Sequence, residues 1–386
     1  MCEPDQMRKQ SRRIYSGFGF GLAALGMMCA AANAAESRSY VVSSLIPAAN
    51  FQDSDCLGGK APGSEQSWRQ GLSSVGLPQA EVDDLLELAM RDRSARTDDA
   101  ITHRGMIDGA RVNVYVHPRS VPDAPVVYST SQRTYGFNLN GVVEMGADTF
   151  EDPETKEVGV DNQWARATGC INPLSSPASA APASLAFAWK VQQQAAAMIM
   201  TISADDFSKD GPATIAFSKS FDTVSSDANS GVRRYSTFRS DPDPRWKGSF
   251  GGHIKDGIFI SDGGDVLSMK TGPFYMAGQV VLKAARMRLD LRSPQQLKGY
   301  VAGYENWKDI YSMFGMWGLN AETLNVVLPQ LYRVLSEKAD FDPDPVTGKN
   351  RAISITYRLE AVPAFIEPAV EGDRPMVSRA ETSRGR

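Results

Sequence analysis

Short apolar segments separated by turns constrain the fold of this chain more than any other feature of its sequence. Residues 198–202, 213–217 and 234–238 are apolar or alternating, and stretches rich in Asp, Gly and Pro separate them. Such segments are typical of antiparallel strands, and their regular spacing is typical of β-sandwiches and jelly rolls. We therefore predict a fold of the α+β class that is mainly β, with a C-terminal antiparallel β-sandwich or jelly-roll-like domain and peripheral helices. Further strands are expected over residues 253–260, 266–269, 279–291, 297–301 and 352–359.

Three segments have the features of helices. In residues 78–90, Pro78 suits a first helical turn, and the apolar residues Val82, Leu85 and Leu86 recur at helical spacing. Residues 305–317 and 321–338 are also expected to be helical. Pro329 lies inside the second of these and is expected to kink or break it, because proline cannot continue the helical hydrogen bonds.

The first 34 residues have the order of an export signal. A basic segment at residues 7–13 precedes an apolar, Gly-rich run, and the small residues Ala32 and Ala34 form a cleavage site before Ala35. The adjacent Arg12 and Arg13 suit a twin-arginine signal as well as an ordinary secretory (Sec) signal, and both interpretations stay open. No later segment is long and apolar enough to span a membrane. We expect a soluble mature protein that is periplasmic or secreted.

Changes in composition divide the mature chain. Residues 35–171 are predicted to form an N-terminal α+β region, and residues 172–184 a linker or loop rich in Pro, Ser and Ala. Residues 185–366 make up the predicted sandwich-like domain. Residues 367–386 are polar and without periodicity, so we predict a disordered tail.

The cysteines predict one disulfide bond. Of the four cysteines, Cys2 and Cys29 lie in the export signal, which leaves Cys56 and Cys170. Two cysteines in an oxidising compartment most simply pair with each other. The alternative is a free nucleophilic thiol, which needs a nearby base, and the chain has only three histidines to offer.

The segment before Cys170 is the best candidate for a ligand site. It combines hydrogen-bonding side chains with an aromatic and a cationic one, the groups that a sugar or another polar ligand would use. The alternative is a buried polar cluster that satisfies backbone groups around the disulfide. Asp161 is in addition a candidate general base. The predicted ligand-binding residues are Asp161, Asn162, Gln163, Trp164 and Arg166.

Two similar acidic turns occupy residues 147–155 and 339–347. In the second, Asp340, Asp342 and Asp344 stand at alternate positions, and alternate carboxylates on a tight loop suit a hard cation such as calcium. Pro345 stands where a calcium-binding EF-hand loop needs glycine, and Arg351 where it needs glutamate. The competing interpretation is a plain turn in which an aspartate accepts backbone hydrogen bonds.

Charge and missing motifs narrow the function. A formal net charge of -4 argues against a nucleic-acid partner and against attachment to anionic lipid. The sequence lacks the common serine-hydrolase, zinc-protease and nucleotide-binding motifs, which leaves enzymatic activity uncertain. We predict an exported binding protein for a carbohydrate, another polar ligand or a partner protein, with calcium as a candidate stabilising ion. The alternatives are a carboxylate-dependent extracytoplasmic hydrolase and a structural or assembly protein of the cell envelope.

Overall fold

The computed structural model describes residues 35–91, 94–122, 126–143, 146, 149–172, 174–175, 196–229, 231–263, 265–269 and 280–368. The predicted export signal, most of the predicted linker and the predicted tail beyond Pro368 lie outside these ranges. The described residues belong to one compact unit that begins at Ala35. Among them, no helix combines the length and the apolar character needed to cross a membrane.

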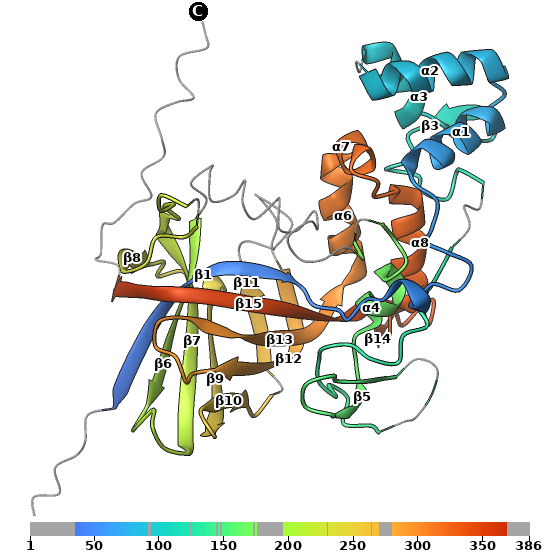
Figure 1. The fold of residues 1–386 in the computed structure, drawn as a ribbon. Coiled ribbons are helices and arrows are strands. Elements are labelled where there is room, and N and C mark those ends of the chain that lie inside the picture. The colour runs from blue at the N-terminus through green and yellow to red at the C-terminus, as the bar shows by residue number, and fades with distance from the viewer. Residues whose placement is uncertain are drawn as a thin grey trace, which may run out of the picture. The chain divides into compact units, whose positions relative to one another are not determined.

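Eight antiparallel strands close into a β-barrel (Figure 1). Each strand pairs with the next, and the pairing of the last strand with the first completes the ring. In order around the barrel the strands are β1 (Glu36–Pro47), β6 (Ala196–Ala204), β7 (Gly211–Thr223), β9 (Lys247–Lys255), β10 (Ile258–Ser261), β12 (Val280–Asp290), β13 (Leu297–Asn306) and β15 (Asn350–Pro368).

The predicted sandwich or jelly roll is therefore wrong, although the mainly β content is right. Two long-range pairings make the difference. β7 pairs with β9, and β15 pairs with β1, so that the sheet closes on itself and does not form two facing layers. Alternation along a strand is the same in both architectures, because each has one buried and one outer face. β1 comes from the predicted N-terminal region, whereas the other barrel strands come from residues 185 onward.

The barrel interior is filled by apolar side chains. Met200 of β6, Phe217 of β7, Phe250 of β9, Phe259 of β10 and Tyr357 of β15 are all buried in one hydrophobic core. Alternate residues face outward, as the two-residue period of a strand requires. An eight-stranded barrel is just wide enough for such side chains to fill it.

Further strands extend this sheet or form small hairpins. β15 is 19 residues long, and its end leaves the barrel to pair in parallel with β8. β11 pairs with β12, and β14 pairs with β15. The bounds are β2 (Gly105–Ile107), β3 (Ala110–Val112), β4 (Phe150–Glu151), β5 (Val158–Val160), β8 (Ser236–Ser240), β11 (Asp265–Met269) and β14 (Phe341–Pro343).

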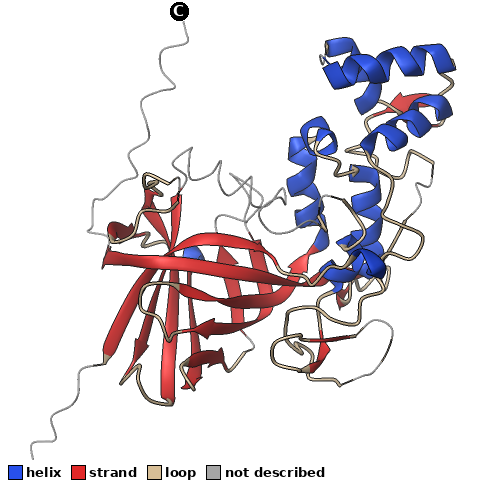
Figure 2. Cartoon of the chain, in the orientation of Figure 1, coloured by secondary structure: helices blue, strands red, loops and turns tan. Residues whose placement is uncertain are grey.

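The helices gather apart from most strands (Figure 2). Ile310 and Phe314 of α6 and Leu331 of α8 join the hydrophobic core that fills the barrel. A second core lies among α1, α2 and α3, around Trp68 and Leu85. The bounds are η1 (Asp53–Asp55), α1 (Ser64–Ser74), α2 (Gln79–Arg91), α3 (Ala95–Thr102), α4 (Gln163–Thr168), η2 (Pro244–Trp246), α6 (Trp307–Trp317), α7 (Leu319–Thr323) and α8 (Leu328–Lys338).

The predicted helices largely agree with the observed ones. Residues 78–90 correspond to α2, and residues 305–317 correspond to α6. The predicted helix 321–338 is divided between α7 and α8, with Pro329 in the first turn of α8. Proline suits that position because the first amides of a helix have no partner within it.

Candidate functional site

Asn162 joins three parts of the chain at the start of α4. Its Oδ1 atom accepts a hydrogen bond from the Ala165 amide at 3.3 Å, which caps the helix. Its Nδ2 atom donates to the carbonyl oxygens of Ala48 at 2.9 Å and Tyr135 at 3.0 Å. The side chain is fully buried. Asn162 thus satisfies backbone groups, as the alternative interpretation of this segment expects.

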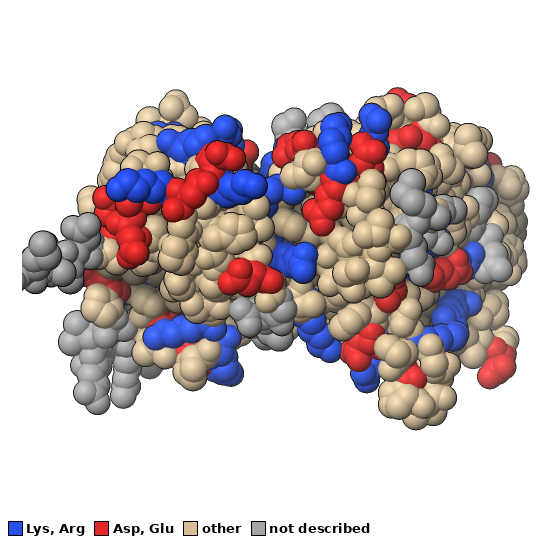
Figure 3. All heavy atoms as spheres, turned by 90° about the horizontal axis from the view of Figure 1, so that it is seen from below, with Lys and Arg blue, Asp and Glu red and all other residues tan. Residues whose placement is uncertain are grey.

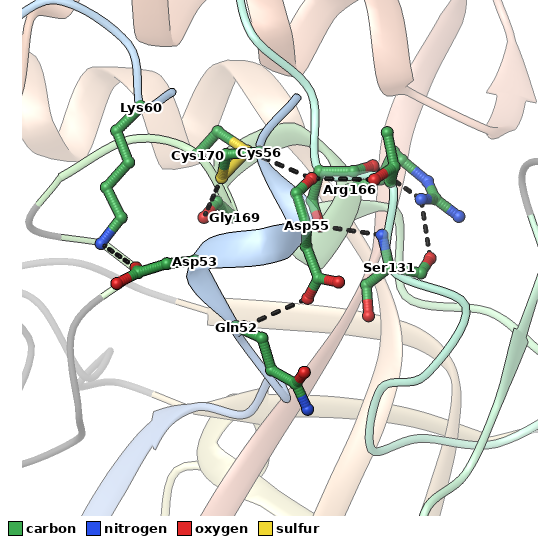
Figure 4. The surroundings of a disulfide bond; sticks show 11 residues. Gln52, Asp53, Asp55, Cys56, Lys60, Ser131, Arg166, Gly169 and Cys170 are labelled. Carbon is green, nitrogen blue, oxygen red and sulfur yellow. Dashed lines mark hydrogen bonds and ion pairs between the residues drawn. A yellow bond between two sulfur atoms is a disulfide. The ribbon is translucent and has the colours of Figure 1, made fainter. Parts of the chain in front are cut away.

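Arg166, one turn further along α4, also bonds to backbone groups, as Asn162 does. Its Nη1 atom donates to the carbonyl oxygens of Ser129 and Ser131 at 2.6 and 2.8 Å (Figure 4). Its guanidinium carbon lies 4.3 Å from the centre of the Phe150 ring, within the range of a cation–π contact. Trp164 is also buried, and the backbone amide of Gln163 donates to Ser354 Oγ at 2.8 Å.

Cys56 and Cys170 lie beside this cluster and are compatible with a disulfide bond (Figure 4). Their Cα atoms are 5.6 Å apart, a normal separation for bonded cysteines. The pair connects the residue after η1 with the chain just beyond α4. A disulfide here fits the predicted extracellular or periplasmic environment.

The two acidic turns have the same local structure. Asp152 Oδ1 accepts the amides of Glu154 and Thr155, and Asp344 Oδ1 accepts the amides of Val346 and Thr347. These contacts are those of a turn stabilised by an aspartate side chain. Asp152 also accepts a bond from Arg288 at 3.0 Å. Burial alone would raise the pKa of Asp152, but its bonds to amides and to Arg288 outweigh burial and lower it.

The three predicted calcium ligands have separate partners. Asp342 forms ion pairs with Lys283 at 2.8 Å and with Arg351 at 2.6 Å, whereas Asp344 bonds within its own turn. Within the described ranges, no group of three His, Cys, Asp or Glu side chains is placed to hold a metal ion. A calcium site at Asp340, Asp342 and Asp344 stays a prediction.

Asp161 and Asp340 interact electrostatically, although the sequence predicted them for different sites. Asp161 Oδ2 accepts the amides of Leu139 at 2.8 Å and Asn140 at 3.2 Å. Burial raises the pKa of Asp161, and these two amides offset only part of the effect.

Asp340 follows α8 and reaches the outer face of the barrel. Its two carboxylate oxygens accept bonds of 2.7 Å from the amide and the hydroxyl of Ser354. Ser354 is fully buried, so the carboxylate head of Asp340 lies against protein even though the residue as a whole is exposed. Burial of the head raises the pKa of Asp340 to about 6, and the charge of Asp161 adds to the rise.

Tyr304 responds to the charges of both carboxylates. It is the cross-strand partner of Ser354 in the β13–β15 register, and its ring stacks on Phe341 with centroids 4.0 Å apart. Burial raises the pKa of the Tyr304 hydroxyl, and the charges of Asp161 and Asp340 raise it further. Arg286 of β12 acts in the opposite direction and lowers the pKa values of Asp161 and Tyr304.

The candidate site therefore consists of two carboxylates with raised pKa values, a buried tyrosine and a nearby arginine. Clusters of perturbed titratable groups are frequent at functional sites. The site could hold a cationic group or accept hydrogen bonds from hydroxyl groups. Of the predicted ligand residues only Asp161 takes part, and Asn162, Trp164 and Arg166 are buried elsewhere in the same segment.

Sequence analysis did not identify Ser354 or Arg286 as site residues. Ser354 lies in the expected strand at residues 352–359, whereas Tyr304 lies beyond the expected strand at residues 297–301. The register that makes Tyr304 and Ser354 neighbours depends on long-range pairing. No family model, curated protein or solved structure matches the chain.

Proposed function

We propose that this chain is an exported binding protein whose site at Asp161 and Asp340 takes a ligand with a positive charge or several hydroxyl groups. The observation that carries the proposal is the raised pKa of both carboxylates, one of which responds to the charge of the other. A raised carboxyl pKa means that the surroundings stabilise the negative charge incompletely. A cationic or hydrogen-bond-donating ligand would supply the missing stabilisation.

Two features support export. The basic segment, apolar run and small-residue site of residues 1–34 are typical of an export signal. Cys56 and Cys170 are placed to form a disulfide, a bond that persists in oxidising compartments. Basic and acidic side chains are interspersed over the face seen in Figure 3, so its described part has no continuous basic surface for a nucleic acid.

Calorimetric titration with three probes tests the binding proposal. Calcium chloride, 1,2-diaminoethane and glucose represent a hard cation, an organic cation and a polyhydroxyl compound. We expect at least one to bind, and Asp161→Asn and Asp340→Asn each to weaken its binding about tenfold or more, because a buried charged contact contributes more than 1.4 kcal/mol. Asp83→Asn removes the same charge from the exposed surface of α2, outside the site, and should bind normally. No binding by any probe, or equal weakening in Asp83→Asn, would contradict the proposal.

A carboxylate-dependent hydrolase is the second candidate. The pKa of Asp340, raised to about 6, favours it, because acid–base catalysts work best when the pKa is close to the operating pH. The test is hydrolysis of p-nitrophenyl glycosides by the purified chain between pH 4 and pH 8. Turnover that is lost in both Asp161→Asn and Asp340→Asn supports catalysis. If the wild-type protein and these two variants turn over the glycosides equally, catalysis of glycoside hydrolysis by the two carboxylates is excluded.

A further inference from the structure

A separate cavity lies on the outer face of the barrel and is lined by residues of β6, β7, β8, β9 and β15. In this region β6, β7 and β9 run side by side, and β8 meets the end of β15 (Figure 1). Its volume is about 510 Å³, within the usual range of small-molecule sites. None of its lining residues belongs to the Asp161–Asp340 site.

The floor of the cavity is built from two rows of side chains in cross-strand register. Ile199 of β6 pairs with Ser218 of β7, which pairs with Lys247 of β9. In the next row, Thr201 pairs with Ala216, which pairs with Ser249. Paired residues of an antiparallel sheet project from the same face. The intervening Met200 and Phe217 belong to the barrel core, so both rows face outward.

Small side chains explain why this surface is hollow. Ser218 and Ala216 occupy the middle of the floor, and Ser249 ends its second row. Larger side chains at these positions would fill the space. The walls rise on the side of β8 and β15. Ser240 of β8 is linked to Ser218 by a bond of 2.8 Å between hydroxyl oxygens, and Ile366 of β15 lines the cavity beside them.

The lining separates into an apolar and a polar part. Ile199 and Ile366 are apolar, and Ile199 is fully buried in a small outer core that Ile366 extends. Among the described residues of the lining, Lys247 is the charged one, and it is the cross-strand partner of Ser218. A cation and hydroxyl donors beside aliphatic surface complement an anionic head on a hydrocarbon chain.

We propose that this cavity binds a free single-chain carboxylate of medium length. Lys247, with the hydroxyls of Ser218 and Ser249, receives the carboxylate, and Ile366, which is only partly buried, contacts the hydrocarbon chain. The occupant is a small anion with one chain because the cavity is limited in volume and its described lining carries one positive charge.

Titration calorimetry with decanoate below its micelle concentration tests the assignment. Acetate supplies the charge without the chain, and octyl glucoside supplies a chain without the charge, so both should bind more weakly than decanoate. Lys247→Glu removes one ion pair and adds a repulsion, which should weaken decanoate binding about tenfold. Lys255→Glu, an equal charge change at the other end of β9, should leave the affinity unchanged.

A second variant tests the position of the hydrocarbon chain. Ala216→Trp places a large side chain on the exposed floor and should abolish decanoate binding without changing the melting temperature. Decanoate affinity that survives both Lys247→Glu and Ala216→Trp would overturn the proposal. The proposal would also be overturned if the wild-type protein sedimented with phosphatidylglycerol vesicles and Lys247→Glu did not. The surface would then recognise membrane lipid.

Discussion

The hydroxyl of Tyr357 donates a hydrogen bond of 2.5 Å to Glu305 Oε2 in the buried region between the barrel and α6. Glu305 is 1% exposed, and its Oε1 atom has no hydrogen-bond partner among the described residues. Burial raises the pKa of Glu305 to about 8, the Tyr357 bond lowers it in part, and the charge of Asp309 raises it.

This pair predicts a fall in stability as the pH rises. The folded state holds a proton on Glu305 up to about pH 8, whereas an unfolded chain releases it near the ordinary value of 4.5. The free energy of unfolding should therefore decrease between about pH 4.5 and pH 8, by roughly 5 kcal/mol. Urea denaturation at several pH values measures the change. Glu305→Gln should flatten the dependence over this range, whereas Glu367→Gln, at an exposed site, should not.

The buried ion pair of Arg104 and Glu322 gives a second prediction. Arg104 Nη2 lies 2.6 Å from Glu322 Oε1, and both side chains are fully buried. Glu322 also accepts bonds from Trp68, Tyr115 and the Leu328 amide, so it connects the helical region of α1–α3 to α7 and α8. Arg104→Met leaves a buried carboxylate without its counterion, which should cost about 3–5 kcal/mol.

Urea denaturation of Arg104→Met measures that cost. Arg69→Met provides the comparison, because Arg69 pairs with Asp83 on the exposed surface, where ion pairs contribute little. Equal losses of stability in the two variants would contradict a special contribution of the buried Arg104–Glu322 pair to stability.

The disulfide gives a third prediction. Its cysteines are 114 residues apart, so the bond closes a long loop in the unfolded chain. The chain-entropy model then assigns it about 4–5 kcal/mol. The double variant Cys56→Ser, Cys170→Ser should lose most of that stability, and the wild-type protein should lose it on reduction. Mass spectrometry of a non-reduced digest should find the two cysteine peptides linked. A free thiol at either cysteine of the mature protein would contradict the disulfide.

Local features of this fold could be predicted from the sequence, and long-range ones could not. The helix at residues 78–90 and the break near Pro329 depend on neighbouring residues, and both agree with the structure. Barrel closure depends on β1 pairing with β6 and β15, which lie far along the chain. No local pattern in residues 36–47 distinguishes that closing strand from a strand at the edge of a sandwich.

The candidate site also combines features that depend on the local sequence with features that depend on long-range pairing. Asp161 and Asp340 were each identified from their local sequence, one beside amides and an aromatic residue, the other in an acidic turn. Their proximity depends on Ser354, which bonds both the Asp340 carboxylate and the backbone amide of Gln163. That contact follows from the strand register, and alternation alone does not determine register.

The pKa of Asp340 tests the central claim most directly. Carboxyl-carbon NMR titration of the wild-type protein and of Asp161→Asn measures it without knowledge of the ligand. We predict a pKa of about 6 in the wild type, because the carboxylate head is buried and Asp161 is negatively charged, and a lower pKa in Asp161→Asn. A wild-type value at the ordinary 3.8, or the same value in both proteins, would contradict a coupled pair of carboxylates.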